Sequence, residues 1–124
     1  MHKLAFKAAE ASHCAKEQGK FWEMHSRMMT DQKMLNDLNA YAYFLDLDIA
    51  QFEDCLKTNK YADEVRKDME LADKLGINGA PSFVLALTDP KDPQKVTGIS
   101  FMRGAQSFAT FKKLIDQALA DVQP

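Results

Sequence analysis

The sequence predicts a mostly helical α/β protein, in which a helical part is followed by a β-hairpin and a last helix. Three observations point to this class. Apolar residues recur every three or four positions along most of residues 1–75, which is typical of amphipathic helices. Two short apolar runs follow Pro81, and each has the length and composition of a strand. The helical period returns in residues 107–120.

Five helices are expected ahead of the strands. The first covers residues 1–18 and ends at Gly19, since glycine commonly follows the last turn of a helix. The other four helices are predicted at 20–29, at 37–45 after an Asn36 cap, at 49–57 after an Asp48 cap, and at 60–75 between Asn59 and Gly76. The helix at 60–75 is expected to bury Val65 and Met69.

Two strands are expected at residues 82–87 and 96–102, joined by a long loop that contains Pro90 and Pro93. The first is a continuous apolar run, which is typical of a strand covered on both faces. Because a lone hairpin is marginally stable, its free edge needs a neighbour. A second copy of the chain, or strands ahead of Met1 in the natural protein, would supply it, and we expect a homodimer through this edge. The final helix is predicted to bury Phe108, Phe111, Leu114, Ile115 and Leu119.

The composition argues against several classes of protein. Of 124 residues, 46% are hydrophobic and 27% charged, which is typical of a globular domain. A net charge of -2 gives no electrostatic basis for binding nucleic acid or an anionic membrane. No apolar run approaches the ~20 residues of a membrane span, and charges such as Lys3 and Lys7 replace the apolar segment of a signal peptide. We find no phosphate loop, catalytic triad, paired-carboxylate site or cofactor motif.

Two cysteines, Cys14 and Cys55, are too far apart in sequence to form a CxxC redox pair. Both fall on faces expected to point inward on neighbouring helices. From the residues alone, three interpretations stay open: a redox-active pair, a structural disulfide, or two buried thiols.

Several other side chains in the helical part have donor atoms or rings that could bind a ligand. His13 and His25 lie near the cysteines in sequence, but the short spacing of zinc ligands is missing, so we expect no metal site. Phe21 and Trp22 are interpreted as anchors of the helical part. Four methionines offer thioether ligands for copper but are more typical of core filling or an adaptable contact surface: Met24, Met28, Met29 and Met34.

Four segments, in this order, resemble the DsbA-type thiol-disulfide oxidoreductases, whose thioredoxin fold carries a helical insert. They are AAEASHCAKEQGKFWEMH (8–25), DCLKTNKYADEV (54–65), GINGAPSF (76–83) and GAQSFATFKKLIDQAL (104–119). The resemblance implies a helical insert subdomain at 1–76 and a partial thioredoxin-fold segment at 77–124, with a cis-proline loop, a hairpin and a C-terminal helix. The chain would then correspond to the C-terminal two thirds of that fold, without the strand and helix that bear the CxxC.

The resemblance also assigns roles to residues. Gly79, Ala80 and Pro81 would form a substrate-binding loop with a cis bond before the proline, although Ala80 replaces the family's usual Thr or Val. Without the family, an ordinary trans turn would be the better interpretation, since few X-Pro bonds are cis. Cys14 and Cys55 match cysteines that make a structural second disulfide in some members. No position inherits a catalytic role.

We therefore expect a truncated DsbA-family protein that is inactive alone, takes protein or peptide substrates with thiols or disulfides, and resides in the periplasm. The alternative is a non-catalytic module that binds peptides or proteins, and the alternative location is the cytoplasm.

Overall fold

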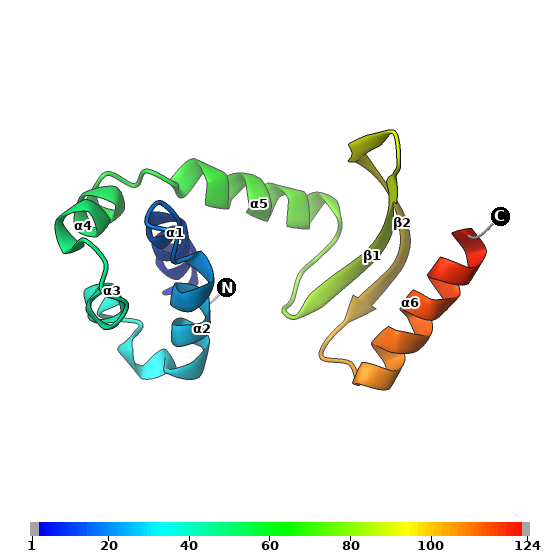
Figure 1. Ribbon diagram of the computed structural model, residues 1–124, viewed down its shortest axis with the longest axis horizontal. Helices are drawn as coiled ribbons and strands as arrows, with labels where there is room; N and C mark the ends of the chain where they lie inside the picture. The colour runs from blue at the N-terminus through cyan, green and yellow to red at the C-terminus, as the bar shows by residue number, and fades with distance from the viewer. Residues whose placement is uncertain (1–2, 123–124) are drawn as a thin grey trace. The chain divides into compact units, whose positions relative to one another are not determined.

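The computed structural model describes residues 3–122, and the chain forms two compact units, Met1–Ala72 and Asp73–Pro124. The described residues hold six α-helices, a short 3-10 helix and a two-stranded antiparallel hairpin (Figure 1). The predicted mostly helical α/β class is confirmed. In chain order the elements are α1 (Ala5–Lys16), α2 (Phe21–Thr30), η1 (Gln32–Met34), α3 (Leu38–Phe44), α4 (Ile49–Lys57), α5 (Ala62–Lys74), β1 (Ser82–Asp89), β2 (Asp92–Arg103) and α6 (Phe108–Val122).

The helix boundaries follow from local chemistry. Gly19 and Gly76 have φ angles of 72° and 68°, so both glycines end a helix in the left-handed conformation as predicted. Asp48 caps α4, and its carboxylate accepts a hydrogen bond from the backbone three residues later at 3.0 Å. The predicted cap at Asn36 is wrong, because the turn after η1 places Asp37 at the start of α3, where its side chain accepts the capping bond.

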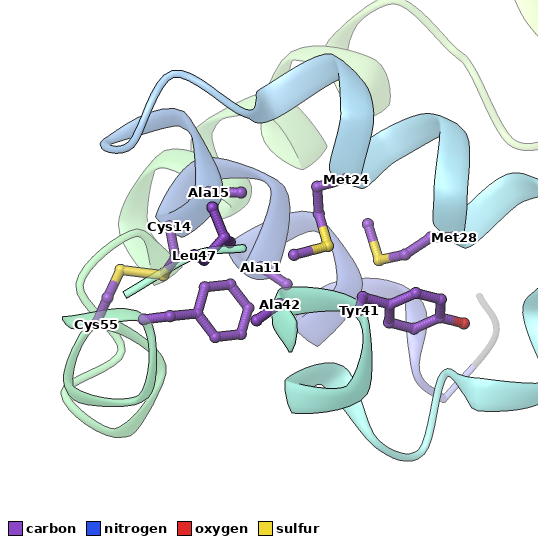
Figure 2. Packing of buried hydrophobic residues seen from close by; sticks show 10 residues of the cluster. Ala11, Cys14, Ala15, Met24, Met28, Tyr41, Ala42, Leu47 and Cys55 are labelled. Carbon is purple, nitrogen blue, oxygen red and sulfur yellow. A yellow bond between two sulfur atoms is a disulfide. The ribbon is translucent and has the colours of Figure 1, made fainter. Parts of the chain in front are cut away.

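Helix α1 lies at the centre of the first unit and contacts α2, α3 and α4. Ala11 and Ala15 are fully buried, and their small side chains let the neighbouring helices approach closely. Around them pack larger side chains from the other helices, above all Tyr41 and Met24 (Figure 2). Phe52 of α4 is also fully buried in this cluster. Close packing of this kind makes large-to-small substitutions costly, at about 3–5 kcal/mol for a buried phenylalanine.

A disulfide crosses this core. Cys14 of α1 and Cys55 of α4 have a Cα–Cα distance of 5.9 Å and an S–S distance of 2.04 Å. The bond closes a loop with a sequence separation of 41 residues, so it constrains most of the first unit in the unfolded chain.

Glu17, at the C-terminal end of α1, links three other side chains. Its carboxylate accepts hydrogen bonds from Lys60 at 2.5 Å, from the Tyr61 hydroxyl at 2.8 Å and from the Gln51 amide at 3.3 Å. The bond from Lys60, followed by that from Tyr61, lowers the pKa of Glu17 below its ordinary value of 4.5. The carboxylate thereby joins α1 to α4 and to the segment ahead of α5.

In the second unit, β1 and β2 pair along almost their whole length. Both strands are longer than predicted, and the expected long loop is wrong, since Thr88 pairs with Val96 near the tip. The Asp89 and Asp92 side chains each accept a hydrogen bond from the backbone two residues later, at 2.8 and 3.1 Å. Such turns by aspartate side chains stabilise a tight reversal, which explains the short tip.

Helix α6 packs on one face of the hairpin. Phe111 meets Phe83 edge to face with ring centroids 4.9 Å apart, and Ala118 is buried. The expected burial of Phe108, Ile115 and Leu119 is wrong, because Phe108 is 83% exposed and the other two are also exposed. Two strands are too narrow a surface to cover the broad apolar arc of this helix.

Three further expectations of burial are wrong. The first strand is not covered on both faces, since Val84 is exposed. Trp22 is 71% exposed, because it points away from the side of α2 on which Met24 enters the core. Met69 is exposed, since the buried residues of α5 are Ala62 and Val65, both in its first turn.

Replacing both disulfide cysteines with serine, Cys14→Ser and Cys55→Ser, should lower the free energy of unfolding of the first unit by about 4 kcal/mol, the loop-closure value for some forty residues. Urea unfolding followed by the fluorescence of Trp22 measures this change, because Trp22 is the single tryptophan and lies in this unit. Reduced wild-type protein is the matched control and should lose the same amount. An unchanged urea midpoint in both samples would contradict the prediction.

The Glu17 cluster should make stability depend on pH. Because the folded pKa of Glu17 is below its unfolded value, the ionised carboxylate stabilises the fold at neutral pH, and this contribution is lost as the pH falls from about 5 through the folded pKa. Glu17→Gln should therefore be less stable than wild type at pH 7 and nearly equal to it at pH 3. Parallel stability curves over this range would refute the assignment.

Candidate functional site

The loop before β1 contains the predicted substrate-binding residues Gly79, Ala80 and Pro81. The peptide bond between Ala80 and Pro81 is cis. The Ser82 hydroxyl donates to the Gly79 carbonyl at 2.6 Å, and the backbone N–H of Gly104 donates to the Pro81 carbonyl at 2.8 Å. These two bonds attach the loop to the start of β1 and to the residue that follows β2.

Ala80 differs from its neighbours, because its backbone N–H and carbonyl have no hydrogen-bond partner among residues 3–122. Residues 79–81 are exposed. Within the described part of the chain, β1 has a strand neighbour on one side only, so its other edge has backbone groups without a strand partner. An edge of this kind can accept an extended segment as an added strand.

The hairpin face opposite α6 is apolar. Val84 and Phe101 are cross-strand partners on this face, and both are exposed. With Leu75 and Ile99 they line a shallow hollow of about 290 Å³. The free edge of β1 therefore adjoins an apolar surface that could contact the side chains of an added strand.

The structure brings Cys14 and Cys55 together as a disulfide within the helical core. Their exposed fractions are 1% and 3%. A nucleophilic cysteine needs an accessible thiolate, and neither residue provides one. Of the three interpretations left open by the sequence, the structure shows a buried disulfide. The disulfide belongs to the first unit, whereas the proline loop belongs to the second.

The two histidines near the cysteines take part in ring packing. His13 stacks on Tyr61 with centroids 5.2 Å apart and meets the edge of Phe21 at 5.8 Å. His25 stacks on Phe21 at 6.5 Å. Since the disulfide occupies both sulfur atoms, a Cys/His zinc site has lost two of its four ligands, and residues 3–122 contain no cluster of three or more His, Cys, Asp or Glu side chains that could hold a metal.

Sequence reasoning missed a buried charge on α1. The Glu10 side chain is 1% exposed and forms an ion pair with Lys7 at 2.8 Å. Lys7 also donates to the Leu56 carbonyl at 3.2 Å and to the Asn59 side chain at 2.6 Å. The available signal was spacing, because Glu10 precedes Cys14 by four residues and so shares its inward face. Glu10 therefore pairs with Lys7, and it is Lys7 that links α1 to the end of α4.

A cavity between α1 and α2 was also missed. It has a volume of about 470 Å³, within the range of small-ligand sites. Helix α1 contributes the small side chains Ala5, Ala8 and Ala9. From α2 it receives His25, Met28 and Met29.

No helix among residues 3–122 has both the length and the apolar character to cross a membrane.

A model of the DSBA-like thioredoxin domain matches residues 1–116, and no solved structure matches the chain. The Na(+)/H(+) antiporter NhaA 3 of Salinispora tropica is 35% identical over 102 residues, which are 81% of this chain and 16% of the antiporter. The Na(+)/H(+) antiporter NhaA 1 of Salinispora arenicola is 39% identical over 85 residues, or 67% of this chain and 13% of that protein. The Na(+)/H(+) antiporter NhaA 1 of Mycolicibacterium gilvum is 38% identical over 86 residues, which are 66% of this chain and 14% of that protein.

The chain therefore spans about a sixth or less of the length of these curated relatives. The family match extends over both units and includes the disulfide, the proline loop, the hairpin and most of α6. A match of this extent establishes the family, and the chain belongs to the DSBA-like thioredoxin domains.

Proposed function

We propose that this chain is the polypeptide-binding part of a DsbA-type thiol-disulfide oxidoreductase and does not exchange disulfides alone. The observation that carries the proposal is that Cys14 and Cys55, its only cysteines, are bonded to each other and buried. Exchange begins with attack by an accessible thiolate. Catalysis would therefore use a CxxC pair that is not among these 124 residues.

The order of elements supports a finer correspondence with the family fold. Helices α1 to α5 would be the helical insert, and β1, β2 and α6 would be the final strands and helix of the thioredoxin fold. Under this correspondence the loop at 79–81 holds an extended substrate polypeptide.

The backbone geometry supports this binding role. Ala80 offers a free N–H and a free carbonyl, and the outer edge of β1 has no strand partner within residues 3–122. Substrates with thiols or disulfides would be held there as an added strand, with main-chain hydrogen bonds giving affinity for many sequences. The exposed Val84 and Phe101 would favour apolar side chains in the bound segment.

A second candidate is a non-catalytic binding domain. The relatives are named as Na(+)/H(+) antiporters, so a domain of this family occurs in proteins whose names describe transport and not disulfide exchange. The same edge would then bind a polypeptide without later chemistry. Insulin reduction by the full-length gene product would support the oxidoreductase, whereas peptide binding without reduction would support the binding domain.

The disulfide also supports a proposed location. Disulfides persist in oxidising compartments and are rare in the reducing cytosol. We therefore propose that the domain functions outside the cytoplasm, in the periplasm or its equivalent.

Two copies could use the edge of β1 in the absence of a peptide. Pairing β1 with its symmetry mate would satisfy the free backbone groups of both chains. The charges allow this arrangement, because Asp89 is the only charged residue of β1 and would lie near Ser82 of the second copy. We propose such a homodimer as the peptide-free form.

The isolated chain should show no disulfide reductase activity. In an insulin-reduction assay, its turnover should equal that of the Cys14→Ser, Cys55→Ser control, because the buried disulfide supplies no thiolate. Turnover clearly above this control would overturn the proposal that the chain needs an external CxxC.

A cysteine-free extended peptide should bind at the edge of β1. We expect amide NMR shifts at Ala80 and along β1, with a change from dimer to monomer in sedimentation velocity at tens of micromolar protein. Val84→Lys should weaken self-association, whereas Val96→Lys, the same change at an exposed valine of β2, should not. Absence of peptide-induced shifts would refute the binding role, and a monomeric peptide-free chain would refute the dimer.

A further inference from the structure

We propose that His25, Met28 and Met29 form a binding site for Cu(I) in the cavity between α1 and α2. Their spacing along α2 is i, i+3 and i+4, which places three side chains on adjoining positions of one helix face. The structure adds what spacing cannot give, since all three line the same cavity of about 470 Å³.

The donor atoms favour a soft, singly charged ion. Met28 and Met29 each offer a neutral thioether sulfur, and His25 offers an imidazole nitrogen; thioethers select Cu(I) over the harder divalent ions. Neither ring nitrogen of His25 has a hydrogen-bond partner among residues 3–122, so one nitrogen is free to bind metal. No carboxylate lines the cavity, which disfavours Mg²⁺ and Ca²⁺.

The surroundings leave the site both spacious and reachable. On the α1 side the lining residues are Ala5, Ala8, Ala9 and Ser12, whose short side chains leave room for an ion, and Gln32 and Leu35 complete the lining. Met28 is 7% exposed and Met29 is 62% exposed, so one thioether reaches the cavity from the core and the other from the surface.

Neither Met24 nor the disulfide sulfur atoms compete for the ion. Met24 lies on the same helix but is fully buried and does not line the cavity, so it fills the core (Figure 2). The Cys14–Cys55 disulfide leaves no thiolate to capture a soft metal elsewhere in the chain.

The chain carries its own reporter for this site. Trp22 is its single tryptophan, and the Trp22 ring centroid lies 5.7 Å from that of His25. An ion bound to His25 would lie close enough to change the fluorescence of Trp22.

The test uses Ag(I), a redox-stable stand-in for Cu(I), added to the full chain in chloride-free buffer. Trp22 fluorescence should change until one equivalent is bound, and native mass spectrometry should show one Ag(I) per chain, whereas Zn²⁺ should produce neither change. His25→Phe, Met28→Leu and Met29→Leu should each weaken affinity by about tenfold or more, since even partners outside the ligand set commonly cost that much.

Matched controls separate ligation from folding. Met24→Leu is the control for the buried Met28, and Met69→Leu is the control for the exposed Met29; both should leave affinity unchanged. If Met28→Leu fails to fold, Met29→Leu still tests the site, because the Met29 side chain is exposed and is not needed for folding. Unchanged Ag(I) affinity in Met29→Leu and His25→Phe, or equal loss in the Met24→Leu control, would overturn the site. Since the cavity lies within the first unit, either result leaves the proposal for the edge of β1 untouched.

Discussion

The close packing of α1 against three other helices is the constraint on which the helical unit depends. Alanines at two fully buried positions, Ala11 and Ala15, let the neighbouring helices pack closely, and the larger side chains of α2, α3 and α4 fill the space around them. The same helix carries one end of the disulfide and, at its terminus, the Glu17 carboxylate. A bulkier residue at Ala11 would separate the helices, so the cysteines and the Glu17 cluster would lose their geometry together.

Sequence alone predicted those features of the fold that are decided locally. Asp48 and Gly76 end or begin helices because of their own hydrogen bonding and φ angle, and both were identified. The exposed face of α6 could not be predicted in the same way. An apolar stripe shows that a helix has something to cover, but Ile115 is buried only if the surface beneath it is wide enough, and a two-stranded hairpin is not.

The candidate sites also differ in whether a local sequence pattern or tertiary packing determines them. The loop at 79–81 and the cysteine pair were recognised because each corresponds to a short sequence pattern of the family. The α1–α2 cavity has no such pattern, since it arises where the alanines of one helix face the methionines of another, and that juxtaposition depends on the angle and distance between the helices. Helical spacing could group His25 with Met28 and Met29, but the space beside them is a tertiary feature.

The two units differ sharply in how much they bury, and this has a consequence for their dynamics. The first unit has a connected core tied by a covalent bond, whereas Ala118 is the one buried residue among the described positions of the second. Resistance of backbone amides to hydrogen exchange follows the free energy of local opening, which rises with apolar burial. The amides of β1 should therefore exchange through frequent local opening while those of α1 remain protected, and we expect the two units to unfold in separate steps. An edge strand that opens often can also exchange its neighbours, and such opening would suit the uptake and release of extended chains that we propose for β1.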